Sequence, residues 1–474
     1  MTVMSLSSKS EASSAASRGA TRPWRLVPRG VRPRPGSPLS PLALLYVFAA
    51  LIVTGAVILS LPACAASGVR TGFLDALFTS ASAVCVTGLV VVDTGTHWAP
   101  LGQAMVLLLI QVGGFGFMAS ATLLLLAFGR RIGLRERLLV GETIGATHPG
   151  GLVSLIQRMA LFAFLAELVG ALVLFGRYTS SLGSARGAWF AVFHSVSAFN
   201  NAGFDIYGDF VSLTTQSNDP VVVLTILSLL VVGGLSFAAL ANIASKRRLS
   251  RLTLDTRLVL ATSGVLILVG TVVYLLAESG NPETMGALAF PQKLMCALFQ
   301  SATPRTAGFT TVNIGAMHDY TLLFTMFLMF VGGAAGSTAG GIKVNTFGLL
   351  IATVVSTLRG REHAEAFGRR FNMNHVLRAL AVVLLAIAFL ATAILLLAYT
   401  EDTDTLSVAF EAVSAFGTVG LSTGITPGLS EAGRVVVIVT MFVGRLGPLY
   451  VALALVQRQK PKEYRYPVES VRIG

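Results

Sequence analysis

The sequence predicts an all-α polytopic membrane protein in which four span–loop–span repeats surround one pseudo-fourfold axis. Three observations predict this fold class: a composition that is 54% hydrophobic and only 12% charged, eight long apolar stretches, and one motif that recurs four times. Soluble domains hold roughly 25% charged residues. A chain of 474 residues with this composition is therefore expected to have lipid as its solvent.

Eight apolar stretches are each long enough to cross the hydrocarbon core of a bilayer. That core is about 30 Å thick, and a helix needs about 20 residues to span it. We therefore expect eight transmembrane helices, at residues 40–62, 99–128, 153–176, 220–244, 258–277, 321–357, 376–399 and 434–456.

The charged residues orient these spans. The N-terminal tail and four of the links, 129–158, 245–257, 358–378 and 457–474, together hold 27 Lys or Arg and 8 Asp or Glu, whereas the other four links hold 5 and 13. Cytoplasmic links hold the excess of Lys and Arg. We therefore expect a multi-pass protein of the cell membrane with both termini in the cytoplasm. Basic clusters such as 246–248 lie beside span ends, which favours membrane anchoring over nucleic-acid binding.

Each of the four outer links contains a short apolar stretch followed by a glycine-centred turn. The copies share the pattern F-x-[SA]-x-[ST], and their glycines, Gly88, Gly203, Gly308 and Gly420, recur 115, 105 and 112 residues apart. Such self-similarity is typical of a repeat architecture. The expected organisation is a disordered basic cytoplasmic tail at 1–38, repeats at 39–130, 131–246, 247–358 and 359–457, and a cytoplasmic C-terminal tail at 458–474.

The four short stretches are expected to be re-entrant loops that meet around a common pore. Non-helical backbone at membrane depth occurs only where protein buries it or water lines it. A short helix that enters from outside directs its C-terminal carbonyls, the negative end of its dipole, toward the centre. The glycine that follows can adopt φ > 0, so backbone carbonyls can replace the hydration shell of a cation. This design favours a dehydrated monovalent cation, because it needs no ring of Asp or Glu.

These residues resemble the Trk/Ktr/HKT superfamily of potassium transporters. The resemblance covers about 40–457 and depends on the segments 82–93 (SAVCVTGLVVVD), 198–205 (AFNNAGFD) and 305–309 (RTAGF). The absence of two extra spans before the first repeat makes the chain most similar to the membrane subunit of Ktr systems. The resemblance implies potassium uptake through a filter of four glycines, the first of which is Ser in some plant sodium-transporting relatives. The implied filter residues, whose backbone carbonyls would bind potassium, are Val86, Thr87, Gly88, Asn201, Ala202, Gly203, Thr306, Ala307, Gly308, Thr418, Val419 and Gly420.

The sixth apolar stretch contains a glycine-rich break. As one helix its 37 residues would be about 55 Å long, and five glycines at 331–344 would each cost about 1 kcal/mol relative to Ala. We therefore expect unwound backbone beside an aqueous cavity. One alternative is close helix packing through small residues. Another is a nucleotide P-loop, but that motif needs a Lys where this sequence has Ile342. The resemblance implies an intramembrane gating loop formed by Gly332, Gly333, Gly336, Ser337, Thr338, Gly340, Gly341 and Lys343.

Arg445 lies near the centre of the last span, where an unpaired charge costs at least about 2.5–3.5 kcal/mol. The resemblance implies that its cation lies below the filter, beside the gate, and repels or regulates passing potassium. The alternative is a structural pair with Glu167, which we otherwise interpret as a hydrogen-bonded helix-packing residue. Asp93, Asp205 and Asp209 follow the filter turns and either concentrate cations at the mouth or are solvated link residues.

The sequence contains no catalytic constellation, so we do not expect an enzyme. Its six histidines form no H-E-x-x-H motif, and no G-x-S-x-G elbow or dinucleotide fingerprint follows a strand pattern. The three cysteines, Cys64, Cys85 and Cys296, have no paired spacing, so we expect free structural thiols. No cofactor is expected: potassium is the substrate, and sodium is left open as an activator or co-transported ion.

The resemblance also implies partners. It implies a homodimer in the lipid bilayer and a ring of cytoplasmic nucleotide-binding subunits that would control a gated, passive or sodium-assisted entry of potassium. The main alternative is a sodium-permeable or poorly selective cation transporter of the same fold. A solute carrier with inverted repeats and a membrane sensor that transports nothing are alternatives from other classes, and neither explains four similar glycine turns on one side.

Overall fold

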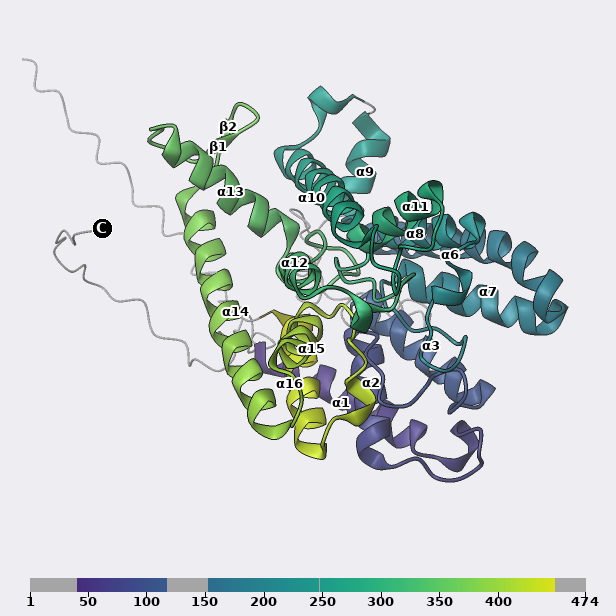
Figure 1. Ribbon diagram of the computed structural model, residues 1–474. Helices are drawn as coiled ribbons and strands as arrows, with labels where there is room; N and C mark the ends of the chain where they lie inside the picture. The colour runs from purple at the N-terminus through teal and green to yellow at the C-terminus, as the bar shows by residue number, and fades with distance from the viewer. Residues whose placement is uncertain (1–40, 117–151, 247, 448–474) are drawn as a thin grey trace, which may run out of the picture. The chain divides into compact units, whose positions relative to one another are not determined.

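The computed structural model describes residues 41–116, 152–246 and 248–447, which are mostly helical (Figure 1). All of them belong to the second of the two units into which the chain divides, Met1–Ser40 and Pro41–Gly474. The prediction of a helical fold is confirmed for this part of the chain. The predicted tails at 1–38 and 458–474, and residues 129–151 of the predicted inner link at 129–158, lie outside the described residues.

Helices account for nearly all regular structure in the described ranges. The α-helices are α1 (Pro41–Leu59), α2 (Phe73–Cys85), α3 (Pro100–Gly114), α6 (Leu152–Leu182), α7 (Ser184–Phe199), α8 (Pro220–Gly234), α9 (Phe237–Lys246), α10 (Leu254–Glu278), α11 (Phe290–Ala302), α12 (Asp319–Phe330), α13 (Val344–Leu358), α14 (Met373–Thr400), α15 (Thr405–Gly417) and α16 (Glu431–Leu446). The antiparallel strands β1 (Glu365–Ala366) and β2 (Arg369–Arg370) form a hairpin between α13 and α14. Short 3₁₀ segments lie at Pro62–Cys64, Thr214–Gln216, Leu249–Arg251, Ile314–Ala316 and Thr426–Gly428.

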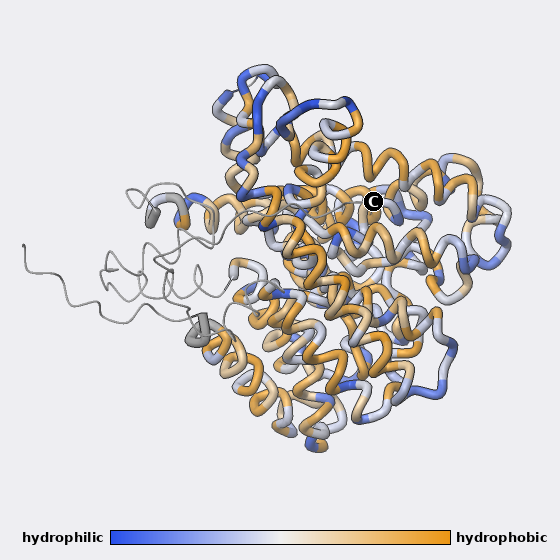
Figure 2. The backbone as a smooth tube through the Cα atoms, turned by 90° about the vertical axis from the view of Figure 1, so that its left-hand side faces the viewer, coloured by the Kyte–Doolittle hydropathy of each residue, from blue (hydrophilic) through white to orange (hydrophobic). Residues whose placement is uncertain are grey.

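Three helices of the described part are long and apolar enough to cross a membrane. They are Ile156–Leu182 within α6, α10 and α14, and only 22–39% of the most apolar window of each is buried inside the protein. Figure 2 shows hydrophobic residues concentrated along the helices and hydrophilic ones in the connecting segments. Apolar helices with so much outward-facing surface are those of a membrane protein, because such surface is stable against lipid.

Four other predicted spans correspond only in part to helices of the described residues. Span 40–62 corresponds to α1, span 99–128 includes α3, and span 434–456 overlaps α16. Residues 117–128 and 448–456 lie outside the described residues. The predicted break at 331–344 occurs, because α12 ends at Phe330 and α13 begins at Val344.

Span 220–244 is not the single straight helix that its hydropathy predicts. It is divided into α8 and α9, which are bent by 96°. The carbonyls of Gly233 and Gly234 leave the helical pattern and accept hydrogen bonds from the 331–343 segment: the Thr338 hydroxyl donates to Gly233 (3.0 Å) and the Ala334 N–H to Gly234 (3.1 Å). The Ser236 hydroxyl accepts from the Ala239 N–H (3.0 Å) and so caps the first turn of α9.

The short helices α2, α7, α11 and α15 pack through the residues of the repeated motif. Its phenylalanines, Phe78, Phe193, Phe299 and Phe410, are all completely buried. Two positions later, three of the four copies have a serine that donates to a carbonyl of a long helix: Ser80 to Ile52 of α1 (2.7 Å), Ser195 to Glu167 of α6 (2.6 Å) and Ser301 to Ile267 of α10 (2.7 Å). The shared spacing therefore anchors α2, α7 and α11 to a long helix through the same serine hydrogen bond.

A partly buried ion pair joins the first and last parts of the described chain. Arg434 on α16 donates from Nη1 to Oδ1 of Asp75 on α2 (2.5 Å) and from Nε to the Leu429 carbonyl (3.0 Å). Both side chains are mostly buried, with 22% and 29% exposed. The pair holds α16 against α2, which places the fourth repeat motif beside the first.

We expect Arg434→Leu to lower the free energy of unfolding by about 1–3 kcal/mol, because it leaves a partly buried carboxylate without its hydrogen-bonded partner. Thermal unfolding of the purified protein in detergent measures the change. Arg177→Leu is the matched control, since the Arg177–Asp219 pair (2.6 Å) has an arginine that is 52% exposed and should contribute about 0–1 kcal/mol. Equal losses in the two variants would contradict a special role for the Arg434 pair.

Candidate functional site

Four turn segments, 86–88, 201–203, 306–308 and 418–420, follow the C-terminal ends of α2, α7, α11 and α15. Each has two residues with positive φ. The first of these residues is not glycine: Val86 (57°), Asn201 (56°), Thr306 (75°) and Thr418 (50°). The second is glycine: Gly88 (93°), Gly203 (71°), Gly308 (77°) and Gly420 (89°). A β-branched residue with positive φ is strained, so the surrounding structure must hold this backbone shape.

One backbone hydrogen bond recurs in all four turn segments. The residue before each glycine donates its N–H to a carbonyl near the end of the short helix, as Thr87 does to Ser82 (2.8 Å). The other three bonds are Ala202 to Ser197 (2.8 Å), Ala307 to Thr303 (2.9 Å) and Val419 to Ser414 (2.9 Å). The four segments therefore share their backbone conformation as well as their sequence pattern.

The four glycines of the turn segments follow one another in a closed ring. A Cβ atom placed on Gly88 would lie 3.1 Å from Cα of Gly203, one on Gly203 would lie 2.8 Å from Cα of Gly308, and one on Gly308 would lie 3.4 Å from Cα of Gly420. A Cβ on Gly420 would lie 3.0 Å from Cα of Gly88, which closes the ring. The space at the centre has no room for side chains at these positions, so backbone atoms surround it.

Backbone carbonyls are the polar groups closest to this ring. The carbonyl oxygen of Ala307 would lie 3.0 Å from a Cβ on Gly203, and that of Val419 would lie 2.6 Å from one on Gly308. The short helices also end here, so their dipoles place negative partial charge toward the same point. Within the described ranges no three His, Cys, Asp or Glu side chains converge as metal ligands, and Cys64, Cys85 and Cys296 are buried and free. The ring is thus suited to a monovalent cation held by carbonyl oxygens.

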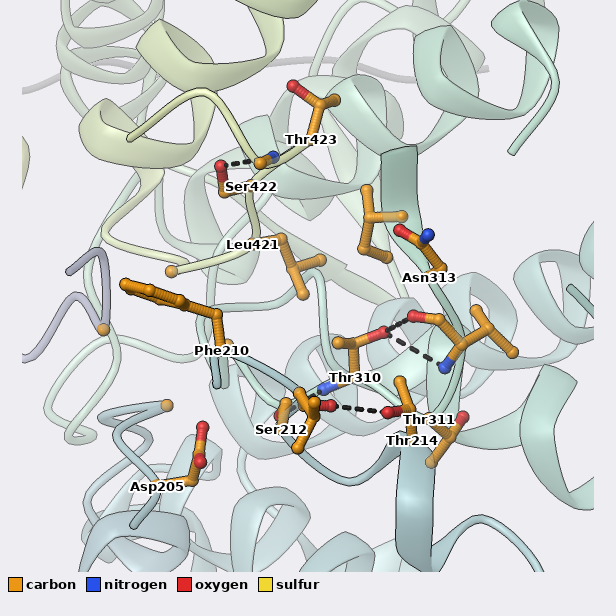
Figure 3. Close-up of a pocket in the computed structure, with 18 of the residues that line it drawn as sticks. Asp205, Phe210, Ser212, Thr214, Thr310, Thr311, Asn313, Leu421, Ser422 and Thr423 are labelled. Carbon is orange, nitrogen blue, oxygen red and sulfur yellow. Dashed lines mark hydrogen bonds between the residues drawn. The ribbon is translucent and has the colours of Figure 1, made fainter. Parts of the chain in front are cut away.

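A cavity of about 570 Å³ lies directly against the ring, and all four glycines line it. We call it the outer cavity, because it lies on the side of the ring that the charge placement predicts to face outward. Its walls come from separate segments of the chain, as Figure 3 shows for Asp205, Thr310 and Ser422. Hydroxyl groups supply most of its polar side chains: Ser212, Thr214, Ser217, Thr284, Thr310, Thr311, Ser422, Thr423 and Thr426. A lining of hydroxyl and carboxyl oxygens can receive a cation that is still partly hydrated.

The three aspartates that follow the turns have different environments. Asp205 lines the outer cavity, and burial together with the nearby Asp93 carboxylate raises the pKa of Asp205 to about 7. Asp93 connects two loops, because its carboxylate accepts hydrogen bonds from the N–H of Thr96 (2.8 Å) and from the N–H of Phe210 (2.9 Å). Asp209 is exposed on a turn. Of the three, Asp205 is therefore the one placed to act on a cation in the cavity.

The 331–343 segment lies against two of the turn segments, on the side that is predicted to face inward. A Cβ on Gly332 would lie 3.3 Å from Cγ2 of Thr306, and one on Gly340 would lie 3.1 Å from Cγ2 of Thr418. Lys343 donates from Nζ to the carbonyls of Ala339 (2.6 Å) and Gly340 (3.3 Å). The lysine therefore closes the segment on itself directly below the ring.

Arg445 reaches this segment from α16. Its guanidinium donates to the carbonyls of Thr338 and Gly113, which joins the segment to the end of α3. The alternative partner, Glu167, is engaged elsewhere: it accepts from Nε2 of Gln111 (3.1 Å) and from Nδ2 of Asn200 (3.0 Å). Among the described residues, Glu167 thus acts as a hydrogen-bonded packing residue and does not pair with Arg445.

The sequence contains a second repeated signal, which the four glycine turns do not reveal. The triplets 112–114, 232–234, 331–333 and 443–445 read VGG, VGG, VGG and VGR. Gly113, Gly233 and Gly444 each leave room for the backbone of a short helix, because a Cβ on them would lie 2.8–2.9 Å from the carbonyl carbons of Val84, Phe199 and Phe416. Arg445 occupies the third position of the last triplet, directly after a glycine that packs against the end of α15, so alignment of these triplets predicts that its side chain starts beside that helix end.

Comparison with known proteins agrees with this geometry. The family model TrkH, described as cation transport protein, matches residues 47–464. The Ktr system potassium uptake protein B of Bacillus subtilis is 39% identical over 434 residues, which cover 92% of this chain and 96% of that protein. The potassium/sodium uptake protein NtpJ of Enterococcus hirae is 37% identical over 443 residues, covering 92% and 98%.

A solved structure supports the fold. The potassium transporter TrkH from Vibrio parahaemolyticus superposes with a TM-score of 0.69 at 20% sequence identity, over 90% of this chain and 86% of that one. The resemblance to Trk and Ktr proteins that the motifs predicted is therefore confirmed. The chain belongs to the TrkH family of cation transport proteins, whose members are transporters and not enzymes.

Proposed function

We propose that this chain is the pore subunit of a potassium uptake system, with the four turn segments as its selectivity filter. The closed ring of four glycines with a shared backbone conformation is the observation that carries the proposal. Carbonyl oxygens held in this way can replace the hydration shell of a monovalent cation. The names of the relatives, potassium uptake protein B and potassium/sodium uptake protein, support potassium as the substrate.

The proposed organisation has four repeats, at 39–130, 131–246, 247–358 and 359–457, around a pseudo-fourfold pore. The recurring N–H to carbonyl bond before each glycine supports it, as do the three equivalent serine contacts of α2, α7 and α11. Charge placement supports an arrangement in the cell membrane with both termini in the cytoplasm.

The proposed gate is the 331–343 segment together with Arg445. The segment has no helical hydrogen bonds of its own across 331–343, and it is held by Gly233, Gly234 and Arg445 instead. A gate held in this way can open when the residues that bond the segment move, because each hydrogen bond contributes only about 1 kcal/mol. We propose that a cytoplasmic nucleotide-binding ring moves these partners in a complex with a homodimer of this chain. The name of the Bacillus subtilis relative, protein B of a Ktr system, supports a subunit that works with others.

The second candidate is a sodium-permeable or poorly selective cation transporter of the same fold. The similarity to a protein named for both potassium and sodium uptake supports this alternative. It leaves sodium as a transported ion, an activator or a co-transported ion.

Ion flux into liposomes that contain the purified chain tests both candidates. Equal inward gradients of potassium, rubidium, sodium or choline are applied, and uptake is followed at a fixed membrane potential, which contributes about 2.3 kcal/mol per charge per 100 mV. Potassium-selective uptake is the result expected for the filter. Equal sodium and potassium uptake would favour the second candidate, and uptake of choline at the same rate would contradict a filter altogether.

A further inference from the structure

The residue that follows the repeated phenylalanine is polar and completely buried in all four short helices. These residues are Thr79, His194, Gln300 and Glu411. Buried polar side chains are costly unless they are hydrogen-bonded. Their common position, behind the four turn segments, raises the question of what they bind.

In the third and fourth copies this side chain reaches the segment that leaves the ring on the outer side. Gln300 donates from Nε2 to the hydroxyl of Thr310 (2.7 Å), two residues after Gly308. Glu411 accepts from the Thr426 hydroxyl, and a 2.9 Å hydrogen bond joins that hydroxyl to Ser422, two residues after Gly420. Thr310 and Ser422 both line the outer cavity (Figure 3).

In the first two copies, the side chain at this position makes a long hydrogen bond to the outer segment or none. Nε2 of His194 accepts a hydrogen bond from the N–H of Ile206 (3.4 Å), which lies three residues after Gly203. Thr79 donates to the Asp75 carbonyl of its own helix (2.9 Å), and no bond to the outer segment of its copy is found among the described residues. The buried side chain of the fourth copy has the greatest need of a hydrogen-bond partner, because Glu411 is a carboxyl group that forms no ion pair within the described part of the chain.

Other attachments of the fourth copy are weaker than those of its counterparts. It has Ala412 where the other three have a serine that bonds a long helix. The Ser414 hydroxyl has no hydrogen-bond partner in the described structure, whereas Ser197 and Thr303 donate to the carbonyls of Phe204 (2.6 Å) and Phe309 (2.5 Å) next to their glycines. Fewer side-chain bonds therefore hold the 418–420 segment in its strained conformation.

We propose that Glu411 is a positioning residue, which fixes the outer end of the 418–420 segment through Thr426 and Ser422 and thereby sets the selectivity of the ring. The inference rests on the proposed function, because it assigns Glu411 a role in the same filter. Glu411 does not touch the ion: it holds the chain that leaves Gly420, and a shift of that chain turns the carbonyls of Thr418 and Val419.

The test compares potassium and sodium uptake by liposomes that contain the wild-type chain or its variants. Glu411→Leu and Thr426→Val should each lower the preference for potassium over sodium about fivefold, the factor that corresponds to one hydrogen bond of average strength. Glu411→Gln keeps an acceptor oxygen at Oε1 and should stay within about twofold of wild type. The double variant should be no worse than either single variant, because both remove the same bond.

Thr79→Val is the matched control, since it removes a buried hydroxyl at the equivalent position that bonds only its own helix. It should leave the selectivity unchanged. Size-exclusion chromatography and thermal unfolding establish that each variant is folded. If Glu411→Leu does not fold, Thr426→Val, which removes a single hydroxyl group, decides the test.

Two results would overturn the inference while leaving the proposed function intact. One is wild-type selectivity in folded Thr426→Val and Glu411→Leu, and the other is a loss in Glu411→Gln as large as that in Glu411→Leu, which would assign the effect to charge. An unselective wild-type chain would overturn the proposed function itself, and this inference with it.

Discussion

Gly88→Ser should admit sodium and lower the preference for potassium over sodium roughly ten- to a hundredfold. Gly88 has a φ of +93°, a conformation that costs a residue with a side chain about 1–3 kcal/mol. A side chain there would also collide with the carbonyl oxygen of Ala202, a neighbour in the ring. The carbonyl must turn away from the centre, and 1.4 kcal/mol of lost potassium stabilisation is a factor of ten.

Uptake of potassium and of sodium by liposomes containing the variant measures this change. Gly68→Ser is the matched control: Gly68 also has a positive φ (69°), but no atom lies within 4 Å of its added Cβ, and the residue is exposed in an outer link. It should keep the wild-type preference. Unchanged selectivity in folded Gly88→Ser would count against the 86–88 segment as part of a filter.

Deletion of residues 334–342 should raise the potassium flux of the chain more than tenfold. The deletion removes the hydrogen bonds of Ala334 and Thr338 to the carbonyls of Gly234 and Gly233, and the carbonyl of Thr338 that accepts from Arg445. Each bond contributes about 1 kcal/mol, so the loss of several shifts a closed–open equilibrium by more than a factor of ten. The Gly340 contact with Thr418, directly below the ring, is lost as well.

The structure indicates that the chain can close after this deletion. The N–H of Val344 donates to the carbonyl of Gly333 (3.0 Å), and that of Gly332 to Ile342 (2.8 Å), so the two ends already lie side by side. Helices α12 and α13 can therefore keep their places when Gly333 is joined to Lys343.

A deletion of equal length, 362–370, is the matched control for the gate. It removes the β1–β2 hairpin, whose strands are half-buried or exposed, and should leave the flux of the chain alone unchanged. Flux through the 334–342 deletion that equals or falls below that of the wild type, in a protein that is folded by thermal unfolding, would contradict a gate.

The local parts of the candidate site were predictable from the sequence. The spacing from Phe78 to Gly88, and its three later copies, placed the short helices and the turns because a helix end and a positive φ depend on residues within one short segment. The break in the sixth apolar stretch was predictable for the same reason, since five glycines in a short segment cannot sustain a helix.

The bend between α8 and α9 was not predictable from hydropathy. The residues at 220–244 are mostly apolar and hold no proline after Pro220, so hydropathy alone favours one helix. The bend depends on donors from Ala334 and Thr338, about a hundred residues later in the chain. The residues at 220–244 do not by themselves indicate that Ala334 and Thr338 will donate to this segment.

The sequence by itself determined that this chain is a helical membrane protein of the TrkH family with four glycine turns, because hydropathy, charge placement and repeat spacing are properties of neighbouring residues. Only the tertiary structure decided that Arg445 bonds the carbonyls of Thr338 and Gly113 and leaves Glu167 to Gln111 and Asn200. It also decided that Glu411 reaches Thr426 behind the ring. A buried charge or carboxyl needs a partner wherever it lies, but the choice among partners is made by packing, which brings together groups that are far apart in the chain.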